Sequence, residues 1–181
     1  MPDFLLTQGC RLVDFKQVRD QLIIDYFLAN AEHLRKSGGP MRDTAAQVQA
    51  MLENWRLNTS ADTDCRFLIM QEDQVIGSIG VSNIVRGAFQ AAYLGYNIGQ
   101  DQQGKGIMTE ALDATIGYAF NELNLHRLMA NYRPENCASA RVLEKLGFIK
   151  EGIAKNYLMV DNQWCDHVLT SKTNSNWTAK P

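Results

Sequence analysis

The chain has 181 residues, a length that fits one domain with a single hydrophobic core, so we expect residues 1–181 to form one domain. Its 45% hydrophobic and 21% charged residues are typical of a globular protein and argue against a disordered, fibrous or membrane chain. The formal net charge of −2 provides no field that would attract a phosphate backbone, so no direct nucleic-acid site is expected.

The beginning of the chain carries no sign of export. Residues Met1–Cys10 lack the basic segment and the long apolar run of a secretory signal. No stretch approaches the roughly 20 apolar residues that a membrane-spanning helix needs. We therefore expect the protein in the cytoplasm, without a membrane partner.

Two helices are predicted in the next part of the chain. Residues Val18–Leu34 have a helical pattern, and the glycine-containing segment Lys36–Pro40 is typical of a loop. After it, apolar side chains recur at i, i+3, i+4 and i+7, which places them on one face of a second helix. These side chains are Val48, Met51, Leu52 and Trp55. The sequence thus predicts two helices before the sheet begins.

Short β-type runs then replace the helical pattern. Phe67–Met70 and Val75–Val81 are separated by the polar segment Gln71–Gln74, which predicts a hairpin. A third strand is expected over Ala91–Ile98, and its tyrosine, leucine and isoleucine content fits a largely buried position.

The rest of the chain alternates between helix and strand. The predicted elements are a helix over Ile107–Asn121, a strand over His126–Tyr132, a short helix over Ala138–Lys145 and a closing hairpin of Ile149–Val160 with Trp164–Ser171. The order ββαβαββ after two helices predicts an α+β fold with a mixed sheet rather than a doubly wound one.

The cysteines and the histidine of the closing hairpin do not suggest a metal or redox site. The cysteines are far apart and contain no C-x-x-C pair, so we interpret them as reduced, packed thiols: Cys10, Cys65, Cys137 and Cys165. The segment Cys165–His167 resembles a ligand set, but adjacent side chains of a strand point to opposite faces and cannot close on one ion. No metal is therefore expected.

The segment Gln103–Met108 is the strongest candidate for a ligand site. It lies between a predicted buried strand and a long amphipathic helix, and its glycines allow backbone N–H groups to crowd towards an anion at the start of the helix. A nucleoside-triphosphate loop is excluded because Gly106 stands where that motif needs Ser or Thr. A dinucleotide fingerprint is excluded because Thr109 stands where it needs glycine.

The segment instead resembles the acetyl-coenzyme A loop of the GNAT superfamily, Q/R-x-x-G-x-G/A, with methionine at the last position. The wider likeness covers roughly the C-terminal three-fifths of the chain and is closest to the ribosomal-protein-alanine N-acetyltransferases of the RimJ type. It is carried by Asn83–Gly87, Tyr93–Gly99, Met129–Tyr132, Asn136-x-x-Ser139, Tyr157-Leu158 and Gln163–Leu169. The resemblance implies the GNAT (acyl-CoA N-acyltransferase) fold, a mixed, mostly antiparallel sheet flanked by helices.

The resemblance also implies roles for individual residues, with acetyl-CoA as the cosubstrate. The pyrophosphate would be held by backbone amides of Gln103, Gly104, Lys105, Gly106, Ile107 and Met108. The pantetheine arm would be bound by the strand residues Tyr96, Asn97 and Ile98, whose free N–H groups could polarise the thioester carbonyl. Asn131 and Asn136 would complete the cofactor site, Asn136 as a hydrogen-bond partner of the pantetheine. Ser139 is the candidate catalytic residue, as proton donor to the departing thiolate.

Two positions depart from the family pattern. Leu143 stands where many members have the tyrosine that protonates the thiolate, and Tyr93 stands where related enzymes have a glutamate base. An α-amino group is about one-tenth neutral at pH 7, whereas a lysine side chain is almost wholly charged, so the missing base favours an N-terminal amine as acceptor. Glu151, Tyr157 and His167 are further residues of the closing hairpin that could reach the cleft as base or relay.

The acceptor is the open part of the interpretation. The first 65 residues match the family poorly, and the loop Gly38–Pro40 replaces a Trp-Glu-Pro signature. The favoured acceptor is the N-terminal alanine or serine of a ribosomal protein. The alternatives are a small-molecule amine and a non-catalytic acyl-CoA-binding or ribosome-assembly module.

Overall fold

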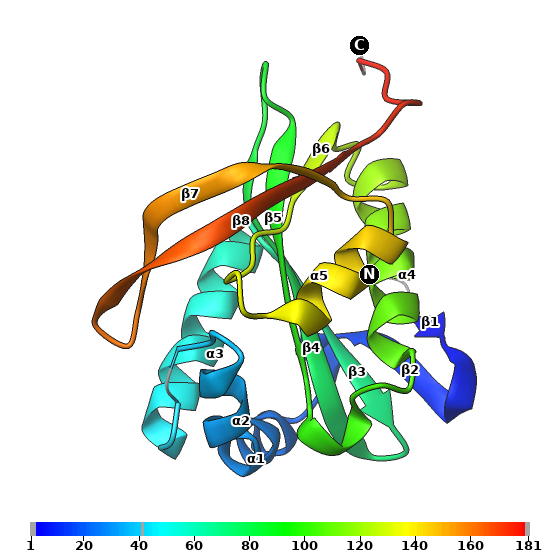
Figure 1. Ribbon diagram of the computed structural model, residues 1–181. Coiled ribbons are helices and arrows are strands. Elements are labelled where there is room, and N and C mark those ends of the chain that lie inside the picture. Colours follow the sequence, from blue (N-terminus) through cyan, green and yellow to red (C-terminus); the bar gives the residue numbers. More distant parts are fainter. Residues whose placement is uncertain (1–2, 41, 180–181) are drawn as a thin grey trace.

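The computed structural model describes residues 3–40 and 42–179 (Figure 1). In this part of the chain one eight-stranded sheet has the order β1-β2-β3-β4-β5-β6-β8-β7. Its strands are β1 (Phe4–Leu5), β2 (Cys10–Asp14), β3 (Cys65–Gln71), β4 (Gln74–Val85), β5 (Ala91–Ile98), β6 (Arg127–Met129), β7 (Ile149–Val160) and β8 (Gln163–Thr173). The α-helices are α1 (Asp20–Ala29), α2 (Ala31–Lys36), α3 (Ala45–Ser60), α4 (Ile107–Asn121) and α5 (Cys137–Lys145).

The sheet is mixed and mostly antiparallel. Every neighbouring pair of strands runs antiparallel except β5 and β6, which are parallel because α4 crosses over between them. Strands β7 and β8 form a long hairpin, and its turn residues Asp161 and Asn162 have φ angles of 48° and 61°, as a type I′ turn requires. This architecture confirms the predicted fold class.

The sheet has a hydrophobic core on each face, and alternate residues of its strands supply the two cores. On β3, Phe67 and Ile69 pack with α4 and α5, whereas Leu68 and Met70 pack with α1 and α3. Figure 1 shows α1, α2 and α3 together on one side of the sheet and α4 with α5 on the other. The predicted apolar face of the second helix is confirmed, since all four of its side chains are buried in α3.

The prediction that two helices precede the sheet is wrong. Strands β1 and β2 come first, and β2 pairs with β3 through contacts such as Leu12 with Ile69. The run Cys10–Asp14 is short and buried on both faces, so it has no alternating pattern to signal a strand. The first predicted helix is also divided, because Asn30 (φ −108°, ψ 9°) interrupts it between α1 and α2.

The elements around the candidate ligand loop match their predictions closely. Strand β5 and helix α4 have the predicted bounds, and α5 begins one residue before its expected start. The predicted strand over His126–Tyr132 is shorter as β6, although Tyr132 still bridges to Val168. None of the helices in the described ranges is long and apolar enough to span a bilayer.

Candidate functional site

The sheet opens between β5 and β6. The two strands pair only where Ala91–Tyr93 meets Arg127–Met129, although β5 continues to Ile98. Beyond that point the chain after β6 follows β8 instead, with the N–H groups of Ala130 and Tyr132 donating to carbonyl oxygens of β8. The far half of β5 therefore keeps its bonds to β4 on one side and offers an unpaired backbone edge on the other.

A cleft of about 700 Å³ lies at this opening. Its walls come from β5, the glycine turn, the start of α4, the face of α5, the end of α2 and β8. The cationic side chains of Arg133, Arg141 and Lys145 line it. The cleft is therefore suited to an extended anionic ligand.

The glycine turn forms the part of the cleft beside α4. Gly104 and Gly106 have φ angles of 74° and 83°, a region that side chains disfavour, and Gly106 is the N-cap residue of α4. No side chain caps this helix end, so its first N–H groups are left for another acceptor. An added Cβ at either glycine would meet nothing within 4 Å, which shows that both face open space. The geometry is that of an anion site at a helix N-terminus.

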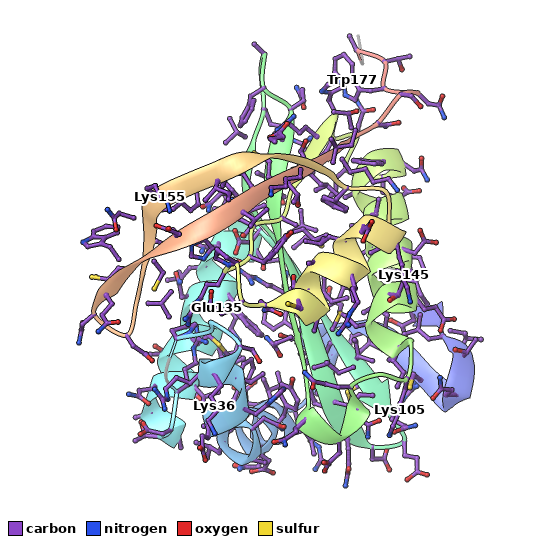
Figure 2. All side chains as sticks on the ribbon, viewed as in Figure 1. Lys36, Lys105, Glu135, Lys145, Lys155 and Trp177 are labelled. Atoms are coloured by element: carbon purple, nitrogen blue, oxygen red, sulfur yellow. The ribbon has the colours of Figure 1, made fainter. Side chains whose placement is uncertain are left out.

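Polar side chains hold this turn in place. The Lys105 ammonium donates to Gln102 (2.9 Å), and Gln8 donates to the Lys105 carbonyl oxygen (2.8 Å). In Figure 2, Lys105 lies at the beginning of α4. The Gln103 amide lies 3.3 Å from Nε2 of His33, which is also 3.2 Å from the Ile98 carbonyl oxygen.

The side chain of Ser139 crosses the cleft to β5. Its Oγ lies 2.6 Å from the hydroxyl oxygen of Tyr96, so the Ser139 hydroxyl forms a hydrogen bond across the cleft rather than with the first turn of its own helix. Burial raises the pKa of Tyr96 to about 12, and the bond to Ser139 lowers it in part. The phenol is therefore protonated at neutral pH and can pass a proton to the serine oxygen. Leu143, in the position of the family tyrosine, is buried in the core.

Asn136 caps α5 rather than projecting freely into the cleft. Its Oδ1 accepts from the Ser139 backbone N–H (3.0 Å) and its Nδ2 donates to the Ser37 carbonyl oxygen (3.1 Å). Replacing Asn136 with Ala removes both bonds, and we expect the free energy of unfolding to fall by about 1 kcal/mol. Urea denaturation would measure this. Asn136→Asp, which keeps the capping oxygen, is the control and should recover most of the loss.

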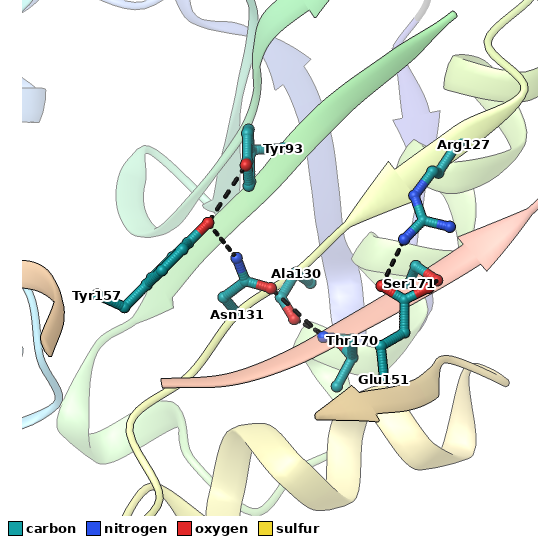
Figure 3. Close-up of polar contacts among 8 residues, drawn as sticks. All are labelled: Tyr93, Arg127, Ala130, Asn131, Glu151, Tyr157, Thr170 and Ser171. Atoms are coloured by element: carbon teal, nitrogen blue, oxygen red, sulfur yellow. Dashed lines mark hydrogen bonds and ion pairs between the residues drawn. The ribbon is translucent and has the colours of Figure 1, made fainter. Parts of the chain in front are cut away.

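A second polar cluster lies where β5, β6, β7 and β8 meet. The Tyr157 hydroxyl is 3.3 Å from that of Tyr93 and accepts from Nδ2 of Asn131 (3.2 Å), as Figure 3 shows. The Asn131 Oδ1 accepts from the Thr170 backbone N–H (3.3 Å). Both ends of the Asn131 amide thus have protein partners, and its role in cofactor binding stays a prediction.

Several cleft residues were not singled out from the sequence. His33 carried no local signal, because its position depends on how α2 packs against β5. The face of α5 that lines the cleft did have a recognisable pattern in the sequence. Ala138, Arg141, Val142 and Lys145 follow i, i+3, i+4 and i+7, so the spacing places both cations on the face that lines the cleft. In the described residues, no group of three or more His, Cys, Asp or Glu side chains could hold a metal ion.

Comparison with known proteins identifies the family of this chain. The family described as "Acetyltransferase (GNAT) domain" matches residues 12–149. A relative from Escherichia coli (strain K12), named [Ribosomal protein uS5]-alanine N-acetyltransferase, is 55% identical, and the match covers 98% of this chain and 95% of that protein.

Solved structures agree with this family. The ribosomal-protein-S5-alanine acetyltransferase from Vibrio fischeri superposes with a TM-score of 0.88 at 34% identity, covering 99% of this chain and 100% of that one. Mycobacterium smegmatis RimJ, solved in complex with CoA-disulfide, superposes with a TM-score of 0.82 at 29% identity, covering 94% of this chain and 85% of that one.

Proposed function

The chain belongs to the GNAT acetyltransferase family, and we propose that it forms a single acetyltransferase domain that moves the acetyl group of acetyl-CoA to the N-terminal alanine of a ribosomal protein. The observation that carries this proposal is the unpaired edge of β5, which leads from the glycine turn to the Tyr96–Ser139 pair. Such an acceptor would place the reaction in the cytoplasm.

The cofactor chemistry fits the residues present. The uncapped N–H groups at the start of α4 would bind the pyrophosphate, with Gly104 and Gly106 keeping the approach free of side chains. Arg141 and Lys145 on α5 add positive charge to the same cleft. The unpaired N–H groups of β5 would bind the pantetheine arm and polarise the thioester carbonyl, because charge builds on that oxygen during acyl transfer.

Protonation of the departing thiolate is assigned to Ser139. Its Oγ is bonded to a phenol with a pKa of about 12, so Tyr96 can return a proton as the serine gives one up. A serine alone is a weak acid, and the pairing explains how the site works with Leu143 in place of the usual tyrosine. This arrangement is a relay of two hydroxyl groups.

The choice of an N-terminal alanine as acceptor is supported by the E. coli relative and by the charge of the cleft. The E. coli relative at 55% identity is named for the alanine of uS5, and the likeness extends over nearly the whole of both chains. Arg141 and Lys145 would repel a polycationic amine, which disfavours a polyamine acceptor. An α-amino group is about half neutral near pH 8 and carries at most one charge, so it suits this cleft better.

Release of free CoA thiol would test the function. Purified protein and acetyl-CoA are mixed with peptides that begin with the alanine of uS5, matched peptides that begin with serine, N-blocked lysine peptides, and spermidine. We expect turnover on the alanine peptide that exceeds that on the lysine peptide by at least about tenfold, since far more of the α-amine is neutral. Turnover on spermidine alone would show that the acceptor is a small-molecule amine rather than a protein N-terminus. Binding of acetyl-CoA without turnover on any acceptor would favour a non-catalytic binding module.

A further inference from the structure

The imidazole of His167 is a buried polar group in the cleft, and only one of its two ring nitrogens has a hydrogen-bond partner among the described residues. The residue lies on β8, is only 5% exposed, and lines the same cleft as Tyr96 and Ser139. Its Nδ1 is 3.1 Å from the carbonyl oxygen of Cys165. Among the residues that the structure describes, none forms a hydrogen bond with its Nε2.

This contact determines which nitrogen of the neutral imidazole carries the proton. A carbonyl oxygen only accepts, so the bond to Cys165 requires the proton on Nδ1. The Nε2 of His167 then presents its lone pair and can accept a proton. The neighbouring Tyr157 ring, with centroids 5.7 Å apart, helps to fix the imidazole plane.

We infer that Nε2 of His167 is the general base of the reaction, acting directly or through one water. This rests on the proposed function. As the acceptor nitrogen bonds to the thioester carbonyl carbon and the C–S bond breaks, the proton that the nitrogen loses passes to Nε2. The departing sulfur takes a proton from Ser139. Exchange with water afterwards returns His167 to its neutral form and Ser139 to its hydroxyl.

The other candidates on the closing hairpin are poor bases. The bond to Tyr93, followed by burial, raises the pKa of Tyr157 to about 12, so its phenol stays protonated at neutral pH. Hydrogen bonds from Arg127 and Ser171 lower the pKa of Glu151, and its carboxylate is occupied by both partners (Figure 3). Of the three candidates on the closing hairpin, His167 is therefore the one whose ring nitrogen Nε2 has no hydrogen-bond partner among the described residues.

Two carboxylates near the His167 imidazole are each paired with a cation. The titratable and charged groups near it are Tyr157 on β7, Asp166 on β8 and Glu135 before α5, with Lys155 and Arg133 paired to the two carboxylates. Each carboxylate stabilises a positive imidazole, and each paired cation reduces that effect.

The variant that tests this base is His167→Asn. An asparagine amide can occupy the place of Nδ1 and keep the bond to the Cys165 carbonyl, while nothing replaces Nε2. We expect kcat on the alanine peptide to fall by about 10²-fold at pH 7, with the Kd for CoA and the melting temperature close to those of the wild type. The matched control is His126→Asn, because His126 packs against Trp177 away from the cleft.

Two readouts separate a base from a structural residue. The wild-type kcat should fall at acidic pH as the base is protonated, and His167→Asn should lack that acidic limb. With a fluorinated alanine at the peptide N-terminus, the acceptor nitrogen loses its proton more readily to water. The ratio of wild-type to variant rates should therefore shrink at least tenfold with that peptide.

Each outcome bears on the inference in a definite way. A variant rate within threefold of the wild type, or a deficit that is the same at every pH and with both peptides, would overturn His167 as the base while leaving the proposed function intact. An inactive wild-type protein would overturn the proposed function and the inference together. Loss of CoA binding in the variant would show that His167 shapes the cleft, which also contradicts the inference.

Discussion

Replacing Gly106 with Trp is expected to weaken CoA binding by at least about 10²-fold. The indole would occupy the space in front of the uncapped N–H groups of α4, where the pyrophosphate is proposed to bind. The substitution also forces a side chain into a φ of 83°. Isothermal titration with CoA would measure the Kd, and thiol release at saturating acetyl-CoA would measure the residual rate.

Two alanine variants separate the strain from the steric block. Gly106→Ala adds the unfavourable φ with little bulk, so we expect about 1 kcal/mol of destabilisation and a modest rise in Kd. Gly117→Ala lies inside α4, where a Cβ meets nothing within 4 Å, and should raise stability by about 0.5–1 kcal/mol without changing the Kd. Tight CoA binding by Gly106→Trp would place the pyrophosphate elsewhere in the cleft.

Removing the Ser139 hydroxyl is expected to lower kcat by about 10²–10³-fold while the Kd for CoA stays within a few-fold of the wild type. Tyr96→Phe should cause a similar loss, because the serine then lacks the phenol that returns its proton. Steady-state thiol release at saturating substrates would give kcat. A control for the tyrosine change is Tyr118→Phe, since Tyr118 packs against Phe67 in the core.

The double variant decides whether the two hydroxyl groups act as one unit. If they form a relay, Ser139→Ala with Tyr96→Phe should be no slower than the worse single variant, whereas independent roles would multiply the losses. A kcat for Ser139→Ala near the wild-type value would remove the serine from the proton path. Thermal melts should accompany the rates, because Ser139→Ala leaves a buried phenol without its partner.

The sequence by itself determined the elements around the proposed ligand loop. The period-2 runs, the helical apolar face of α3 and the glycines before α4 are local patterns, so β5, α4, α5 and the closing hairpin could be placed closely. The loop Gln103–Met108 was found because its chemistry depends on backbone groups and on a helix start, both of which are set within a few residues.

Only the tertiary structure decided which side chains meet across the cleft. Tyr96 and Ser139 are 43 positions apart, and Tyr93 and Tyr157 are 64 apart, so no spacing in the sequence relates them. Strand β2 was missed for a similar reason: it is short and mostly buried, so it has no alternating pattern, and its place is fixed by pairing with β3. Strand β1 has only two residues and is placed by its pairing with β2. Long-range pairing, which opens β5 from β6, is what creates the cleft and turns His167 towards it.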